Sequence, residues 1–332
     1  MNDCVNAIGR TGYPSREQSS SAGRVDTSQK PVHRLQGIRC ENHDYCAPSF
    51  YMITMTTLGR RPLFAACDNN KATLNEDGWL VYKLWHDMPK TYPEIATSTL
   101  VIMPDHLHGI VHVKEEMAQS VGVPLRAFKS QVTSALRKKY NNPSLSVWNA
   151  GYHDLCVWRK GSLKAYTHYL CDNPRRACLK RAHPDLFKRV NHLTHPRLPA
   201  EQVWSGYGNL FLLDRPDMIN IRVSRKTAPD EIACLRQEIL DQATHGTVVV
   251  SPFISPGEKE IATDILKADK GDVILMKPDG FPELFKPNGK YFDLCAQGRL
   301  LILSASSDLS PSLSRETCLR MNAWCEAISR YV

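Results

Sequence analysis

The sequence of 332 residues lacks any apolar run close to the roughly 18 residues that a membrane-spanning helix needs, so we expect no membrane span and no membrane partner. Its first thirty residues lack an apolar segment, which argues against a secretory signal. No C-x-x-C pair occurs among its eleven cysteines, and an odd number of them cannot all be paired. These absences predict reduced thiols and a cytoplasmic protein.

What the sequence contains is ordinary globular composition, with 42% hydrophobic and 23% charged residues and no internal repeat. Its length suggests two domains or one large one. Residues 1–32 are polar and rich in Ser and Gly, and we expect a flexible tail there. We assign residues 33–200 to a first domain and residues 205–332 to a second, because the order of predicted elements changes near residue 200.

In the first domain, strands are predicted at 50–56 and within 97–113, where Pro104 interrupts the run. Apolar residues at helical spacing predict three helices, at 74–88, 124–140 and 161–173. Pro174 is expected to stop the last of them. This order, without regular alternation, favours an α+β domain with a largely antiparallel sheet.

In the second domain, short apolar strands alternate with helices. The strands are expected at 209–213, 247–250, 272–276 and 300–304. The helices are expected at 229–243, 257–267, 291–296 and 315–329. Such alternation favours an α/β, Rossmann-like domain with a parallel, doubly wound sheet.

Positive charge is concentrated in one segment. Residues 123–190 contain fourteen Lys and Arg residues against three acidic ones, a net charge of +11, whereas the rest of the chain carries −3 within the total of +8. Such a block is the electrostatic footprint of a polyanion partner, although a solvated helix face gives the same pattern. Trp and Tyr residues interleaved with the block offer stacking surfaces, which favours single-stranded or hairpin nucleic acid.

Two histidines separated by one apolar residue end a predicted strand. Side chains alternate along a strand, so His106 and His108 project from the same face. Two such imidazoles can hold a divalent cation and leave positions open for a substrate oxygen. Taken alone, this pair is a weak metal signal.

A tyrosine and an asparagine share one face of the helix predicted at 161–173. Tyr169 and Asn173 are one turn apart. A tyrosine hydroxyl can act as a nucleophile when a cation assists it, and an amide oxygen can bind a hard cation. A core or base-stacking role is the alternative for Tyr169.

Five segments, in this order, resemble the REP-associated tyrosine transposases, which are single-tyrosine HUH transposases of bacteria. They are Arg-Arg-Pro-Leu-Phe (60–64), Val-Ile-Met-Pro-Asp-His-Leu-His-Gly-Ile-Val (101–111), Ala-Phe-Lys-Ser (127–130), Val-Trp-Asn-Ala-Gly-Tyr-His-Asp (147–154) and Tyr-Leu-Cys-Asp-Asn-Pro-Arg-Arg-Ala (169–177). The resemblance covers about residues 33–190. It implies a ferredoxin-like antiparallel sheet and a DNA strand transferase.

The resemblance also implies roles for individual residues. His106 and His108 would bind Mg²⁺ or Mn²⁺, with Asn173 completing the site, and Tyr169 would form a 5′-phosphotyrosine. The partner would be single-stranded or hairpin DNA of the repetitive extragenic palindrome type, handled near the nucleoid by a monomer or a homodimer. The basic residues expected at the DNA are Arg126, Lys129, Arg137, Lys138, Lys139, Arg159, Lys160, Arg175 and Arg176.

The second domain weakly resembles the Rossmann-like domain of DNA-processing protein A. After the strand at 247–250, a loop with Ser251, Ser255 and Gly257 leads into a helix and could cradle a phosphate. Glu258 stands where that anion would lie, so helix capping by Ser255 is the preferred interpretation. Two other functions stay open: a catalytically silent nucleic-acid-binding regulator, and a nucleotide sensor that acts through this second domain.

Overall fold

The computed structural model describes residues 43–157, 161–268, 270–309 and 313–330. The predicted tail at 1–32 and the two basic residues Arg159 and Lys160 lie outside these described residues. The chain divides into two compact units, one up to Cys178 and one from Leu179 onward. Each unit is described by itself below.

The first unit contains a four-stranded, fully antiparallel sheet in the order β4-β5-β1-β6. Its strands are β1 (Ser49–Thr56), β4 (Ile95–Ile102), β5 (His106–Val113) and β6 (His153–Cys156). Helix α1 (Glu76–Thr91) joins β1 to β4, and helix α2 (Gly122–Lys139) joins β5 to β6. This β-α-β-β-α-β order is the ferredoxin-like arrangement, so the expected antiparallel sheet with helices is confirmed.

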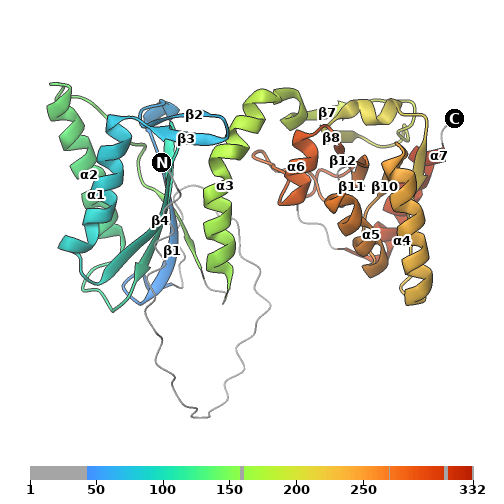
Figure 1. Cartoon of the computed structure of the whole chain (residues 1–332), viewed down its shortest axis with the longest axis horizontal. Helices are drawn as coiled ribbons and strands as arrows, with labels where there is room; N and C mark the ends of the chain where they lie inside the picture. The colour runs from blue at the N-terminus through green and yellow to red at the C-terminus, as the bar shows by residue number, and fades with distance from the viewer. Residues whose placement is uncertain (1–42, 158–160, 269, 310–312, 331–332) are drawn as a thin grey trace, which may run out of the picture. The chain divides into compact units, whose positions relative to one another are not determined.

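Alternation along the strands decides which face of this sheet is apolar. Tyr51, Ile53 and Met55 of β1 are fully buried, and the residues between them are only partly buried. The buried side chains join those of α1 and α2 in one core that includes Trp85 and Phe128. Figure 1 shows α1 and α2 on one side of the sheet and helix α3 (Ser162–Ala182) on the other.

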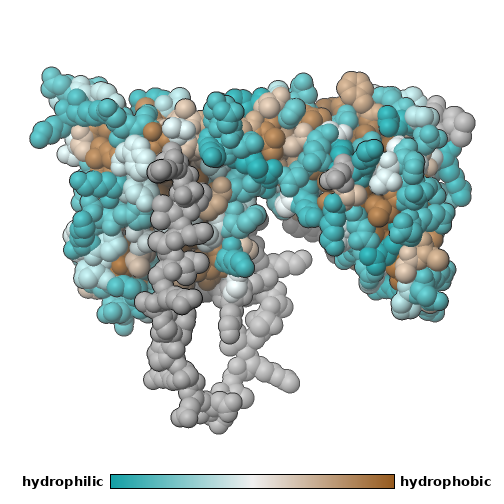
Figure 2. All heavy atoms as spheres, viewed as in Figure 1, coloured by the Kyte–Doolittle hydropathy of each residue, from teal (hydrophilic) through white to brown (hydrophobic). Residues whose placement is uncertain are grey.

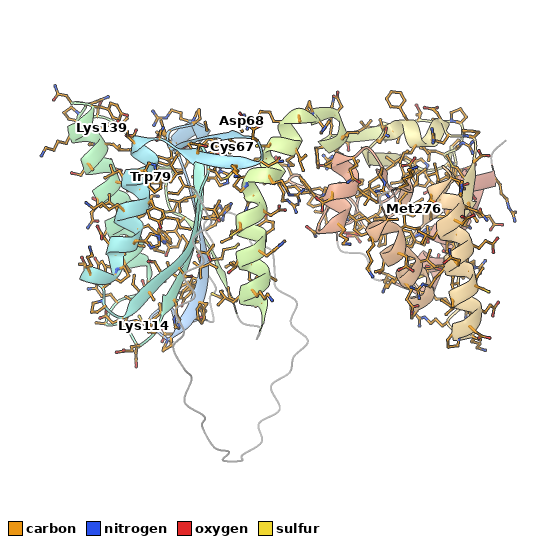
Figure 3. The ribbon with its side chains drawn as sticks, viewed as in Figure 1. Cys67, Asp68, Trp79, Lys114, Lys139 and Met276 are labelled. Atoms are coloured by element: carbon orange, nitrogen blue, oxygen red, sulfur yellow. The ribbon has the colours of Figure 1, made fainter. Side chains whose placement is uncertain are left out.

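Two short elements lie where β1 ends. The 3-10 turn η1 (Leu58–Arg60) follows β1 directly, and a hairpin of β2 (Ala65–Asp68) and β3 (Lys71–Leu74) leads into α1. Figure 3 shows this hairpin, with Cys67 and Asp68 labelled, at the same end of the unit as Lys139, whereas Lys114 lies at the opposite end.

Helix α3 differs from its prediction because it continues through Pro174. A proline inside a helix provides no N–H for the carbonyl four residues earlier, which here belongs to Leu170. The side-chain amide of Asn173 donates to that carbonyl at 3.3 Å and to the carbonyl of Tyr169 at 3.2 Å. The asparagine thus replaces the missing donor, and the helix runs on to Ala182.

The second unit contains a six-stranded mixed sheet in the order β7-β8-β12-β11-β10-β9. Its strands are β7 (Arg189–Leu193), β8 (Trp204–Gly208), β9 (Met218–Asn220), β10 (Val248–Ser251), β11 (Val273–Met276) and β12 (Leu300–Ser304). Strands β9 to β12 are parallel neighbours, but β8 is antiparallel to β12 and to β7. The fully parallel sheet that we predicted is therefore wrong for β7 and β8. Because β7 belongs to this sheet, the second unit begins before residue 200.

Helices cover both faces of this second sheet. They are α4 (Pro229–Thr244), α5 (Pro256–Lys267), α6 (Lys290–Ala296) and α7 (Arg315–Arg330). Along β12, Leu300 and Ile302 join an apolar cluster with α4, α5 and α6, whereas Leu301 and Leu303 join a cluster with α7. Hydrophilic residues dominate the outer surface seen over α4 (Figure 2).

One predicted strand of this unit is wrong. The apolar run at 209–213 forms the 3-10 helix η3 (Leu210–Asp214), which Asn209 caps by accepting a hydrogen bond from the N–H of Phe211. Another 3-10 turn, η2 (Pro184–Phe187), precedes β7. In the described part of the chain, no helix is both long and apolar enough to cross a bilayer.

Candidate functional site

The histidine pair lies at the start of β5, on the sheet face that α1 and α2 do not cover. Leu107 points into the core, and so does Gly109, where an added Cβ would lie 2.2 Å from the ring of Trp85. Glycine at this position lets β5 approach α1 closely. His106 and His108 therefore point to the opposite face, where their ring centres are 4.8 Å apart.

Each histidine is oriented through its Nδ1 atom. His106 Nδ1 lies 2.6 Å from a carboxylate oxygen of Asp105, and His108 Nδ1 lies 2.8 Å from the hydroxyl oxygen of Thr54. An ionised carboxylate only accepts, so a neutral His106 carries its hydrogen on Nδ1 and its lone pair on Nε2. The Thr54 hydroxyl can accept from His108 in the same way. Hydrogen bonds of this kind orient metal-ligating histidines.

A third side chain extends this arrangement. The Arg60 Nε lies 3.1 Å from the second carboxylate oxygen of Asp105. The Asp105 carboxylate is one-quarter exposed, and the His106 side chain is 17% exposed. Arg60 and His106 thus fix the carboxylate from both sides.

The donor set fits a divalent cation that takes part of its ligands from substrate. Two imidazoles with their Nε2 lone pairs directed by such contacts supply two ligands. Among the described residues, no group of three or more His, Cys, Asp or Glu side chains could hold a metal. A cation here would need further oxygen ligands, from an amide, from water or from a phosphate.

His112 lies further along β5 with the same side-chain parity but has a packing role. Its ring stacks on Phe50 of β1, with centres 3.9 Å apart and planes 2° from parallel. Burial lowers the pKa of its imidazole. It thus differs from the pair at the start of the strand.

The tyrosine and asparagine predicted to act with the histidines lie on α3. Tyr169 is 41% exposed, and the Arg176 guanidinium carbon lies 5.7 Å from its ring centre. Asn173 uses its amide nitrogen within the helix, so its Oδ1 is the amide atom that suits a cation. The structure brings His106 next to His108 and Tyr169 next to Asn173. The described contacts of Tyr169 lie within α3 and do not join the two pairs.

The basic residues expected at DNA are distributed over both sides of the first sheet. Arg175 and Arg176 are on α3, whereas the others that the structure describes are on α2, which Figure 1 shows across the sheet. Those on α2 are Arg126, Lys129, Arg137, Lys138 and Lys139. The single basic block of the sequence thus becomes two surfaces.

Several of these cations already have protein partners. Lys129 Nζ lies 2.6 Å from the carbonyls of Asn149 and Gly151, and burial lowers the pKa of its ammonium group. Lys139 contacts Glu76 and Asp77 at 2.9 and 2.7 Å, and these carboxylates raise its pKa.

The cations on α3 and α2 also differ in whether an acidic residue pairs with them. Arg175 is paired with Asp172 at 2.6 Å, whereas Arg126 and Lys138 are exposed on α2.

Sequence reasoning missed three contributors to the histidine site. Asp105 precedes the strand, where alternation does not predict side-chain direction, and Thr54 meets His108 only through the β1–β5 register. Arg60 was named only as part of the segment 60–64 that carries the family resemblance. An acidic residue directly before the first histidine is the one signal that could have suggested an orienting partner.

The phosphate loop considered for the second unit is filled by the protein itself. The buried Glu258 carboxylate accepts from the N–H groups of Val223, Ile254 and Ser255 at 3.1, 2.6 and 3.1 Å. The Ser255 hydroxyl in turn accepts from the Glu258 N–H at 3.2 Å, which completes a capping box. The preferred interpretation, helix capping by Ser255, is confirmed.

Known proteins resemble parts of this chain. No family model matches it. An uncharacterised protein of Haemophilus influenzae is 28% identical over 163 residues, which cover 43% of this chain and 89% of that protein. A REP-associated tyrosine transposase, solved with a REP hairpin, is 14% identical with a TM-score of 0.32, covering 42% of this chain and 74% of that one.

Two further solved structures resemble parts of the chain. A candidate transposase from Deinococcus radiodurans is 14% identical with a TM-score of 0.28, covering 41% of this chain and 98% of that one. DNA-processing protein A from Helicobacter pylori, solved in a study of single-stranded DNA binding, is 20% identical with a TM-score of 0.34, covering 43% and 66%. The structural neighbours of this chain are thus transposases and a DNA-binding protein.

Proposed function

We propose that this protein cleaves and rejoins single-stranded or hairpin DNA through a 5′-phosphotyrosine on Tyr169. The observation that carries the proposal is the histidine pair: the two ring centres lie 4.8 Å apart on one face of the sheet, and each Nδ1 atom lies within hydrogen-bond distance of an oxygen. Two imidazoles held in this way can each offer Nε2 to one cation. The Tyr-x-x-x-Asn-Pro segment of α3 supplies the nucleophile that such a site would serve.

Mg²⁺ or Mn²⁺, held by His106 and His108, would polarise the scissile phosphate and stabilise the charge that develops on it. The Oδ1 atom of Asn173 is the third protein ligand that we propose. Arg60 and Asp105 would keep His106 oriented, and Thr54 would do so for His108.

The chemical step is a transesterification. The Tyr169 hydroxyl oxygen forms a bond to phosphorus as the bond between phosphorus and the 3′ oxygen breaks. The proton lost by Tyr169 is balanced by the proton gained on the departing 3′ oxygen. The products are a 5′-phosphotyrosine and a free 3′-OH, which can attack the linkage and rejoin the strands without water or a high-energy cofactor.

A covalent-adduct assay tests this proposal. The full-length protein would be incubated with a library of hairpin oligonucleotides carrying single-stranded flanks, with Mn²⁺ or with a chelator, and denatured. We expect a slower-migrating protein–DNA species that needs Mn²⁺ and is absent from Tyr169→Phe.

Tyr166→Phe is the matched control, because Tyr166 lies on the same helix one turn earlier. An adduct that persists in Tyr169→Phe would refute the assignment. Salt-dependent binding without any adduct would instead support a catalytically silent DNA-binding protein.

A further inference from the structure

A groove of about 470 Å³ runs beside α2, between that helix and the loop that precedes β6. None of its nine lining residues is acidic. The lining residues whose side chains carry N–H or O–H donors include Lys129, Ser130, Ser134, Arg137 and Ser146. A groove with this lining attracts an anion that accepts several hydrogen bonds.

One of these donors is placed to bind a ligand. Arg137 is exposed, and it donates from Nε to the Leu145 carbonyl at 2.9 Å, a bond that does not use its two terminal amino groups. Trp148 also lines the groove, but its indole Nε1 is buried in the core of this unit, where a ligand cannot reach it.

The groove is attached to the end of the sheet that carries the histidine pair. The Asn149 N–H donates to the Thr56 carbonyl, and the Leu58 N–H donates to the Val147 carbonyl, at 2.9 and 2.8 Å. Thr56 is also the residue paired with His106 across β1 and β5. A strand that passes around this end of the sheet would meet the histidine pair on one side and the groove on the other.

We infer that the groove binds a phosphate of the single-stranded DNA flanking the cleaved position. The inference rests on the proposed function, which supplies single-stranded DNA as the ligand, and it adds a second DNA-binding position to the proposed active site. A guanidinium whose terminal amino groups have no partner among the described residues, together with serine hydroxyls, suits phosphate oxygens, and such contacts position a strand without reading its sequence. Lys129 holds the loop wall of the groove in place.

Binding of a flanked hairpin oligonucleotide, measured by fluorescence anisotropy at several salt concentrations with a chelator present, tests the groove. We expect Arg137→Gln to weaken binding about tenfold and to reduce the slope of log affinity against log salt by about 0.7, the value for one lost contact to a single strand. Lys114→Gln is the control, because it removes an equal charge at the opposite end of the unit (Figure 3). Equal effects of the two substitutions would overturn the inference.

Ser134→Ala is the second variant, because Ser134 is exposed and the substitution removes one hydroxyl from the lining of the groove. We expect weaker DNA binding with an unchanged melting temperature, whereas unchanged binding would overturn the role of this donor. The adduct assay separates this subsite from the chemistry. If Arg137→Gln alone loses binding and the protein forms no adduct, the groove is supported and the proposed function is refuted. If the protein forms an adduct and all variants bind DNA equally, the proposed function is supported and the groove is refuted.

Discussion

The two sheets of this protein differ in how many of their faces are buried in apolar clusters. The first sheet buries one face under α1 and α2 and places His106, His108 and Thr54 on the other. The second sheet buries both faces in apolar clusters, one shared with α4, α5 and α6 and one with α7. A sheet covered on both faces leaves chemistry only to the loops at its strand ends.

The candidate anion sites of the two units differ in the same sense. In the second unit, the loop after β10 already contains a carboxylate, because Glu258 accepts three backbone N–H groups. In the first unit, the groove beside α2 has donors and no acidic residue. A loop sequence that resembles a phosphate cradle therefore does not predict an anion site until its own acidic residues are placed. The first unit is the better location for the DNA chemistry that we propose.

The largest expected effect comes from the histidine pair. His106→Ala or His108→Ala removes one of two proposed imidazole ligands, so we expect adduct formation to fall by about three orders of magnitude or more. His112→Ala, on the same face of β5 but stacked on Phe50, is the matched control. Equal losses in all three variants, measured as initial rates with Mn²⁺, would mean that the face acts only as a scaffold.

A smaller effect is expected from the residues that orient the pair. Asp105→Asn keeps the shape of the side chain but weakens its acceptor for His106, and Thr54→Val removes the acceptor for His108. We expect each to raise the Mn²⁺ concentration needed for half-maximal adduct formation about 10- to 100-fold. An unchanged Mn²⁺ requirement would contradict this orienting role.

The next test concerns the loop after β10 in the second unit, which the Glu258 carboxylate fills. Glu258→Ala leaves three N–H groups without an acceptor in a buried site, and we expect the unfolding free energy of this unit to fall by about 3 kcal/mol. Adduct formation per folded molecule should not change. Denaturant melts followed by Trp fluorescence, together with the adduct assay, measure both quantities. A stability loss below about 1 kcal/mol would show that the carboxylate is not a structural acceptor.

The smallest effect concerns the cap of α5. Ser255→Ala removes the hydroxyl that accepts from the Glu258 N–H, and N-cap substitutions of this kind cost about 1 kcal/mol. Ser255→Thr keeps a hydroxyl acceptor, so we expect it to recover most of the loss. A melting temperature equally low in both variants would show that the cap geometry does not set the stability.

Local sequence patterns predicted the structure well where one periodicity, of a strand or of a helix, determines which side chains are buried. The alternation of 106–108 placed both histidines on one face. The helical spacing that predicted the helix at 124–140 is that of Phe128, Val132 and Leu136, which are buried in α2. Residues 209–213 failed because a short apolar run fits a strand or a helical turn equally well, and here Asn209 caps a turn.

Features that depend on distant partners could not be predicted. The end of α3 was placed at Pro174 because a missing N–H normally stops a helix, and only the structure reveals that the Asn173 side chain replaces it. The contact between Thr54 and His108 requires the strand register. The division of the basic residues between two sides of a sheet requires the topology, which net charge along a sequence does not contain.

The most direct test of the central claim is the position of the covalent bond. The Mn²⁺-dependent adduct would be digested with nuclease and protease, and the peptides analysed by mass spectrometry. We expect a nucleotide mass attached to the peptide at Tyr169, with unmodified Tyr166. A nucleotide on any other residue, or none in a reaction that has produced cleaved DNA, would contradict it.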